Sequence, residues 1–199
     1  HGAMLPSGMI SFATTSMIAD INPGATAGSD PDEFTKVGNW VFFAATDATN
    51  GRELWKINLT TMAATLVKNL RPGSGSSSPH HLAECNGKLV FSCEADPTNI
   101  GDELYVSDGT DAGTVLLMDI IAGNGDANIQ RISTQAGVTY FSANGISGSG
   151  NHLFRTDGTT AGTVLVADYG SVSVPSESAI PALTVGGAFF FMAPSVKFS

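Results

Sequence analysis

Short apolar runs separated by turn residues recur along the whole chain. The clearest runs lie at 40–43, 89–91, 139–141 and 189–191. A weaker apolar run precedes each of them, around 34–37, 82–85, 132–135 and 182–185. Two turn residues join each pair of runs: Gly38-Asn39, Asn86-Gly87, Ala136-Gly137 and Gly186-Gly187. Runs of this length, rich in aromatic and β-branched residues, predict antiparallel strands joined by tight hairpins.

A third and a fourth strand complete each predicted unit. The third strand begins at Leu54, Leu104 or Leu153, and the fourth ends at Leu70, Ile120 or Tyr169. The three leucines that open the third strand are 50 and then 49 positions apart, so one unit recurs along the chain. A period of that length, filled with short strands, is typical of β-propellers and similar arrays.

The two ends of the chain match two halves of one unit. Residues 17–24 match 66–73, which predicts the tail of a unit without its front, and 180–193 match the front of a unit without its tail. Pairing these segments would build one more blade and remove two exposed sheet edges. We therefore expect an all-β propeller of four blades, each of four antiparallel strands, closed by pairing of the N- and C-terminal segments. Half of an eight-bladed dimeric ring is the alternative.

This interpretation divides the chain into one domain of four blades. Residues 1–4 are expected to be a tag remnant, and 5–199 to form the propeller. The expected blades are 31–78, 79–128, 129–178, and 179–199 together with 5–30.

Charge and hydropathy exclude two classes of partner. The chain of 199 residues has a net charge of −9, and a surface of that sign repels phosphate backbones, so we expect no nucleic acid as partner. No apolar run approaches the roughly 20 residues that a membrane-spanning helix requires, so we expect no membrane span.

The two cysteines, Cys85 and Cys93, flank a predicted hairpin. Asn and Gly tolerate the positive φ of a type I′ turn, so Asn86-Gly87 is expected to form that turn. Cys85 would then lie opposite Lys88, and Cys93 opposite His80. The two thiols would point to opposite faces of the sheet, so we expect two buried free cysteines and no bridge.

One motif within the units resembles a known repeat. Residues 103–110 read Glu-Leu-Tyr-Val-Ser-Asp-Gly-Thr and are followed by Ala-Gly-Thr at 112–114. The copy at 153–166 matches closely, whereas the copy at 54–67 keeps the Glu-Leu-Trp start and has Asn-Leu-Thr at 58–60. The pattern resembles the ELWxxDGT repeat of large secreted bacterial proteins. The resemblance implies an extracellular or cell-envelope bacterial protein and identifies no catalytic residue.

Two interpretations fit the Asp-Gly-Thr segments at 108–110 and 157–159. The Asp and Thr side chains can satisfy backbone donors of a turn while Gly takes positive φ. Alternatively the oxygens could hold calcium or another divalent metal. The segments lack the alternating acidic residues of a strong calcium site, which favours the turn. Likewise, Glu53 and Glu103 are expected to accept backbone hydrogen bonds at the blade edge, and His152 replaces them in the third copy.

Candidate binding residues lie where the copies differ, because a repeat scaffold can vary at a site built on it. The residues that lead into the first strand of each unit would converge near the central axis on one face. With one residue from the loops between the second and third strands, the expected ligand-binding set is Asp32, Glu33, His80, His81, Gln130, Arg131 and His152.

His80 and Asp32 could also hold a metal or form an acid–base pair. Adjacent histidines of a strand point to opposite faces, so His80 and His81 could share one ion only if the chain bends there. No Gly-x-Ser-x-Gly, His-Glu-x-x-His or phosphate-loop motif is present. We therefore expect a module that binds a glycan, a small molecule or a protein, as a monomer or homodimer. The alternatives are a metal-dependent hydrolase or lyase at the channel mouth and a structural spacer of an adhesin-like protein.

Overall fold

The computed structural model describes residues 17–24, 28–96, 100–144, 151–168, 183–185 and 188–190, and the strands in these residues form four separate antiparallel sheets. The first sheet contains β1 (Asp32–Val37), β2 (Trp40–Asp47), β3 (Gly51–Asn58) and β4 (Ala64–Lys68). The second contains β5 (His80–Cys85), β6 (Lys88–Cys93), β7 (Glu103–Ser107) and β8 (Val115–Met118). The third contains β9 (Gln130–Gln135), β10 (Val138–Asn144), β11 (Asn151–Thr156) and β12 (Val164–Ala167). A two-stranded hairpin follows, made of β13 (Leu183–Val185) and β14 (Ala188–Phe190).

Each four-stranded sheet is a meander in which the order in space follows the order in sequence. The hairpin turns explain this topology, because residues with positive φ join the first two strands. Asn86 and Gly87 have φ values of 51° and 76°, and Ala136 and Gly137 have 49° and 79°. Positive φ at both central residues is the type I′ geometry that matches strand twist. The all-β class and the four-stranded antiparallel unit are thus confirmed for three units.

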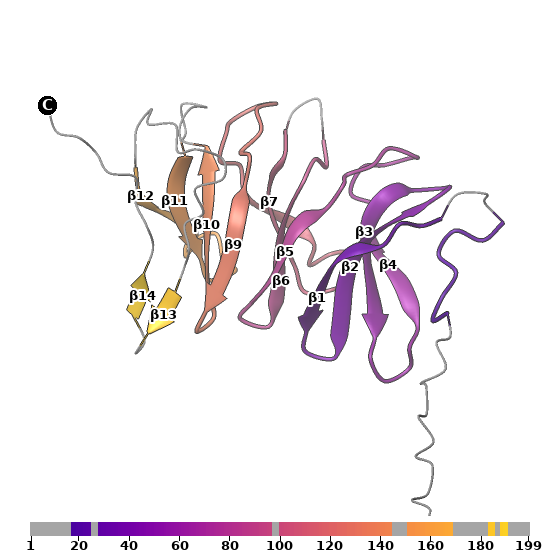
Figure 1. Cartoon of the computed structure of the whole chain (residues 1–199). Coiled ribbons are helices and arrows are strands. Elements are labelled where there is room, and N and C mark those ends of the chain that lie inside the picture. The colour runs from indigo at the N-terminus through magenta and orange to yellow at the C-terminus, as the bar shows by residue number, and fades with distance from the viewer. Residues whose placement is uncertain are drawn as a thin grey trace, which may run out of the picture.

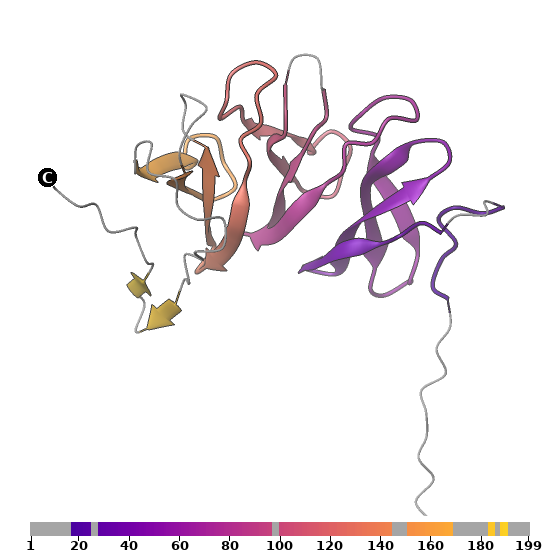
Figure 2. The same ribbon diagram turned by 45° about the horizontal axis from the view of Figure 1, so that its top comes forward.

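The three sheets stand side by side in a row and fan out from their first strands (Figures 1 and 2). β1 contacts β5 and β5 contacts β9, so the first strands of the sheets are neighbours. The core fills the two spaces between the sheets. Val37, Phe42, Leu54, Val67 and Leu70 of the first unit pack with Leu89, Phe91, Cys93 and Tyr105 of the second. The other face of the second unit packs on Phe141, Ala143 and Phe154 of the third.

Alternation along the strands assigns the two cysteines to different faces of the second sheet. Cys85 packs toward the third sheet and Cys93 toward the first, and both are buried and free, as expected. Cys85 also pairs with Lys88 as predicted. The expected pairing of Cys93 with His80 is wrong, because His80 lies opposite Ser92. A β-bulge between His80 and Ala83 shifts the register at this point.

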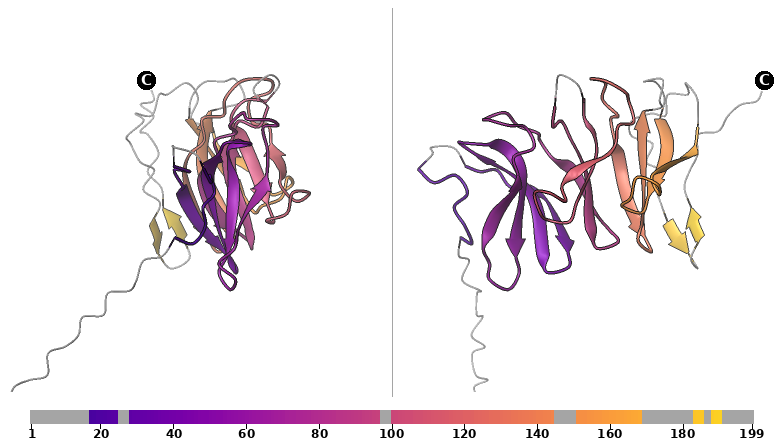
Figure 3. Two further views of the ribbon diagram at one scale, coloured as in Figure 1. Left: turned by 90° about the vertical axis from the view of Figure 1, so that its right-hand side faces the viewer. Right: turned by 180° about the vertical axis from the view of Figure 1, so that it is seen from behind.

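The expected closed ring of four blades is wrong for this structure. The described residues form three four-stranded sheets, and the two-stranded β13–β14 takes the place of a fourth. Figure 3 shows β13–β14 beyond one end of the row, while residues 17–24 lie at the other end, beside the first sheet. The fan that the packed sheets form leaves these two segments apart. The expected tag at 1–4 and parts of the expected fourth blade lie outside the described residues. No helix in the described ranges is long and apolar enough to cross a bilayer.

Candidate ligand-binding site

A bulge at the start of the first strand shapes the candidate site. Glu33 in β1 and His81 in β5 occupy equivalent positions and have φ values of 59° and 53°. In both strands the register shifts at this point. The bend brings the rings of His80 and His81 to a centroid distance of 4.7 Å, with 56° between their planes. The adjacent histidines therefore lie close together, which a regular strand would not allow.

His80 is held at both ring nitrogens. Nε2 lies 3.0 Å from Oδ2 of Asp102, and Nδ1 lies 2.9 Å from the main-chain oxygen of Ser78. A histidine donates from both nitrogens only when it is protonated. The hydrogen bond to Asp102 is the main cause that raises the pKa of His80, against the opposing effect of burial. With both nitrogens engaged, His80 has no lone pair to offer a metal ion or a substrate proton.

His81 has the opposite electrostatic environment. Burial, and then the neighbouring His80, lower the pKa of its imidazole. Its Nδ1 is buried and has no hydrogen-bond partner in the described part of the chain. Glu33 reaches this pair of histidines from the first sheet, where its Oε2 accepts a hydrogen bond from Leu82 N at 3.3 Å. The predicted convergence of Glu33, His80 and His81 is thus present.

A polar hollow of about 260 Å³ opens beside His80. Its lining is Ser77, Ser78, His80, Glu94, Asp102 and Asp126. His80 is the first residue of β5, and three loops supply the others: the one that enters β5, the one between β6 and β7, and the one that follows β8. The lining holds three carboxyl groups and two serines, so it suits a ligand that donates hydrogen bonds or carries positive charge.

Main-chain and side-chain hydrogen bonds hold the loops around the hollow. Asp102 N donates to Oδ1 of Asp126 at 2.9 Å, and Ala127 N donates to the Asp102 carbonyl at 2.9 Å. Glu94 forms an ion pair with Arg71 at 3.3 Å. Oδ1 of Asp102 is buried and has no hydrogen-bond partner in the described ranges, so this oxygen remains available to a donor.

The remaining predicted residues lie apart from the hollow. Asp32 forms an ion pair with Arg52 and not with His80. Gln130 opens β9, where its carbonyl accepts a hydrogen bond from Ser142 Oγ at 3.2 Å. The side chain of Arg131 lies outside the described residues. His152 is buried, with Nδ1 2.9 Å from Oδ1 of Asp168, and does not line the hollow.

These positions bear on the predicted metal site of His80 and Asp32. The two residues have different partners, and His80 uses both nitrogens. In the part of the chain that the structure describes, no three His, Cys, Asp or Glu side chains are grouped so that they could hold a metal ion. The arrangement around His80 therefore resembles a binding pocket more than a metal centre.

Of the six lining residues, His80 alone belongs to the predicted ligand-binding set, and the set lacks Ser77, Ser78, Glu94, Asp102 and Asp126. Aligning the loops provides a signal for Asp126, because Ser76 is its equivalent in the first unit. Ser76 Oγ accepts a hydrogen bond from Arg52 N at 2.9 Å, as Asp126 does from Asp102 N. The second unit thus has a carboxylate where the first has a hydroxyl group. For Glu94 the sequence offers no comparable signal.

The glutamate that the first two units share has the structural role that the sequence predicted. Both carboxylate oxygens of Glu53 are buried and accept hydrogen bonds from main-chain N–H groups of Leu70, Arg71 and Ser77. Ser77 Oγ adds a hydrogen bond of 2.6 Å. Among the described residues, Glu103 accepts hydrogen bonds from Ile120 N and Ile121 N, at 2.7 and 3.1 Å. Burial raises the pKa of Glu103 to about 7.

The Asp-Gly-Thr segments form turns, as the favoured interpretation predicted. Oδ1 of Asp108 accepts hydrogen bonds from N and Oγ1 of Thr110 at 2.8 and 2.7 Å. Thr110 Oγ1 in turn accepts from Gly113 N at 2.9 Å, and Asp157 and its neighbours repeat the network. These bonds lower the pKa of Asp108.

Each of these turns also rests on the preceding sheet. Lys56 Nζ donates to the Gly109 carbonyl at 2.7 Å, and Lys68 Nζ donates to the Thr114 carbonyl at 3.0 Å. In the next unit, Asn86 Nδ2 donates to the Asp157 carbonyl at 3.2 Å. The turn therefore links neighbouring units.

Comparison with known proteins adds no assignment: no family model, curated protein or solved structure matches this chain.

Proposed function

We propose that this chain is a binding module of a secreted or cell-surface bacterial protein, and that it binds a small polar ligand in the hollow beside His80. The carrying observation is the chemistry of the lining, in which Glu94, Asp102 and Asp126 face a space of about 260 Å³. A protonated His80 neutralises part of one carboxylate, and Arg71 part of another. Carboxyl oxygens remain to accept hydrogen bonds from a ligand.

The ligand class that best fits this lining is an amine-bearing sugar or another small molecule with an amino group and hydroxyl groups. An ammonium group would be attracted to the carboxylates, and hydroxyl groups would bond to the serines. Oδ1 of Asp102 is a specific acceptor, because a buried carboxylate oxygen without a partner lacks stabilisation that a ligand donor would supply. A neutral apolar molecule would find few contacts here.

The repeat architecture supports a binding role over catalysis. Neighbouring first strands place the entry loops of successive units on one face, as in propellers that bind ligands. We propose that the three sheets are blades of a propeller-like array. The bacterial cell-surface location rests on the resemblance of residues 103–114 to the ELWxxDGT repeat.

A titration against glucosamine, N-acetylglucosamine and glucose tests the ligand class. We expect chemical-shift changes at His80, Asp102 and their neighbours with glucosamine, and weaker changes with the two neutral sugars. Asp102→Asn should weaken glucosamine binding at least tenfold. Asp119→Asn is the matched control, because Asp119 is an exposed carboxylate of the same unit outside the hollow. Equal responses to all three sugars, or an equal effect of both variants, would overturn the proposal.

A structural spacer is the second candidate. The specific observation is the linkage of neighbouring units through the Asp-Gly-Thr turns, which requires no ligand. Under this role, amine-bearing sugars would cause no shift at the hollow, while Gly109 or Gly158 variants would loosen the array.

A further inference from the structure

In the described part of the chain, the last strand of the third sheet is not covered by a following sheet, whereas the last strands of the first and second sheets are. Val67, Leu117 and Val166 occupy the same position in the last strand of their sheets. Val67 and Leu117 are 6% and 5% exposed, because each packs against the next sheet. Val166 is 45% exposed. At its last strand, the third sheet is therefore exposed on the face that points toward a following unit.

The first sheet is only partly covered on its opposite face. In the second sheet, Leu89 and Tyr105 point toward the preceding sheet and are buried. Their equivalents in the first sheet, Val41 and Trp55, are only half-buried. Phe34 on β1 is 59% exposed, although it stacks on Phe43 at 5.4 Å.

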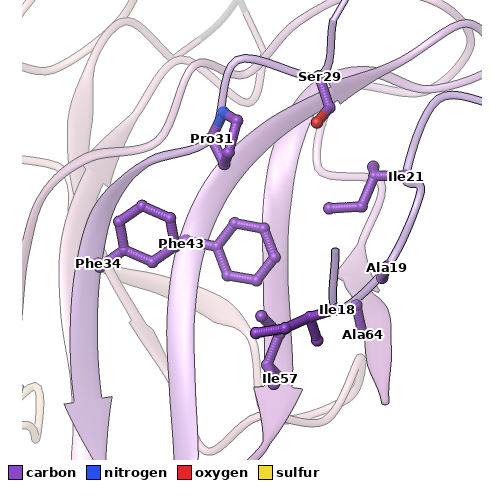
Figure 4. A pocket seen from close by; sticks show the side chains of 9 residues that line it. All are labelled: Ile18, Ala19, Ile21, Ser29, Pro31, Phe34, Phe43, Ile57 and Ala64. Carbon is purple, nitrogen blue, oxygen red and sulfur yellow. The ribbon is translucent and has the colours of Figure 1, made fainter. Parts of the chain in front are cut away.

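An apolar groove of about 240 Å³ runs along this face of the first sheet. Figure 4 shows Phe34, Phe43 and Ile57 on the sheet side, with Ile18 and Ile21 of the incoming segment opposite them. Ile18 is 50% exposed, so the segment covers the face only in part. An exposed apolar surface bordered by polar residues is typical of a contact site.

The repeat itself indicates what fits this groove. Ile18 and Ile21 match Val67 and Leu70, which pack beside Phe91, the equivalent of Phe43. Residues 17–21 thus lie on the first sheet in the place that the tail of a unit takes on the second sheet. Within the residues that the structure describes, no strands corresponding to the front of that unit pair with this segment.

The hairpin β13–β14 has the form of such a front. Val185 pairs with Ala188 across its turn, as Val37 pairs with Trp40 and Cys85 with Lys88 at the start of complete units. Among the described residues, no third strand pairs with β14. Within the described ranges, β13–β14 thus forms the first two strands of an incomplete unit at one end of the row. Residues 17–24 form the last segment of an incomplete unit at the other end.

We propose that these two ends bind each other between copies of this chain, head to tail. In this contact the third sheet and β13–β14 of one copy pack against the first sheet and residues 17–24 of the next. The occupant is a second copy because the two ends of one chain point away from each other (Figures 2 and 3). The interface extends the packing that joins the three sheets within the chain. Two copies would close a ring of roughly eight units, the upper end of the usual range for propellers.

Light scattering coupled to size-exclusion chromatography of the full chain tests this contact. We expect the wild type to elute at a multiple of the monomer mass of 20.5 kDa. Phe34→Asp blocks the end that carries the first sheet, and Val166→Asp blocks the other end, so each variant alone should run as a monomer at 10 µM or below. Val115→Asp is the control, because Val115 is 47% exposed on the middle sheet, and it should assemble like the wild type.

Mixing the two blocked variants distinguishes this geometry from a symmetric dimer. Each variant keeps one intact end, so equimolar Phe34→Asp and Val166→Asp should form a one-to-one complex. Ile18→Asp, on the same end as Phe34, should reproduce the result if Phe34→Asp unfolds. A wild-type monomer, or a mixture that stays monomeric, would overturn the proposal. Loss of amine-sugar binding without loss of assembly would refute only the proposed function.

Discussion

Replacing Ser77 with alanine should destabilise the fold more at pH 8 than at pH 5. Glu53 is fully buried, and Ser77 Oγ donates the shortest of its hydrogen bonds, at 2.6 Å. A hydrogen bond to a charged group contributes about 1.5–3 kcal/mol, so we expect Ser77→Ala to lower the free energy of unfolding by about 2 kcal/mol at pH 8. The three main-chain donors to Glu53 remain in the variant.

The pH dependence follows from the pKa of Glu53. Burial raises this pKa, while the hydroxyl group of Ser77 lowers it by favouring the ionised form. Loss of the hydroxyl group raises the pKa further. A carboxyl group whose pKa is raised in the folded state destabilises the fold as pH rises through that pKa. The loss of unfolding free energy in Ser77→Ala should therefore become smaller as pH falls through the pKa of Glu53. The second unit provides the reference: Glu103 has Ala127 in the place of Ser77, and its pKa is raised to about 7.

Urea unfolding followed by circular dichroism at pH 5 and pH 8 measures the effect. Ser142→Ala is the control, because Ser142 Oγ donates to a neutral carbonyl, that of Gln130. Its loss should be about 1 kcal/mol and equal at both pH values. An equal loss at both pH values for Ser77→Ala, or no greater loss than the control at pH 8, would refute the reasoning. Conversely, Ala127→Ser should lower the pKa of Glu103 and stabilise the fold at pH 8.

Three other changes give independent tests. Gly113→Ala should lower the free energy of unfolding, measured by thermal unfolding, by about 1–3 kcal/mol, because a Cβ would overlap the Asp108 carboxylate. Adding Asp108→Ala should restore part of this loss. If the losses of the two single variants simply add in the double variant, the overlap is not the cause. The His80–Asp102 pair should stabilise the fold fully below about pH 6.5 and lose its effect as pH rises through the raised pKa of His80, so Asp102→Asn should lower that pKa in an NMR titration. Ala136→Gly should raise the free energy of unfolding by about 0.5–1 kcal/mol, because Ala136 has a φ of 49°, and a decrease in thermal stability would contradict this.

Local chemistry explains why the strands and turns could be predicted. Asn86 and Gly87 form the turn that their sequence specifies, and Asp108 accepts the hydrogen bonds expected of an Asp-Gly-Thr turn. These features depend on residues within a few positions of each other. The hydrogen-bonding role of Glu53 was predicted for a different reason: its partners are remote in sequence, but two of the three units have a glutamate at this strand position.

Closure of a ring depends on different quantities. The angle between neighbouring sheets depends on the volume of the side chains packed between them, such as Phe42 and Phe91. The repeat length of about 50 residues does not determine this angle. The sequence repeat therefore indicates the number of units but not whether the first and last units come into contact. The expected four-bladed closure was wrong for this reason.

The site was predicted in part. His80 and Glu33 were placed near each other because equivalent positions of neighbouring strands converge. A bend at His80 and His81 was considered but not predicted, since strand alternation assumes an unbroken register, whereas a bulge there brings the two rings together. Glu94 and Asp126 were missed because they reach the hollow through the packing of loops remote in sequence.

The left-handed backbone at Glu33 and His81 limits how this face can diversify. A β-branched residue at such a φ is strained, whereas asparagine, aspartate and glycine adopt it readily. Directed evolution of new specificities should therefore exclude valine, isoleucine and threonine at positions 33 and 81. At position 94 these three residue types can be included. Libraries designed in this way would retain more folded members for the same number of clones.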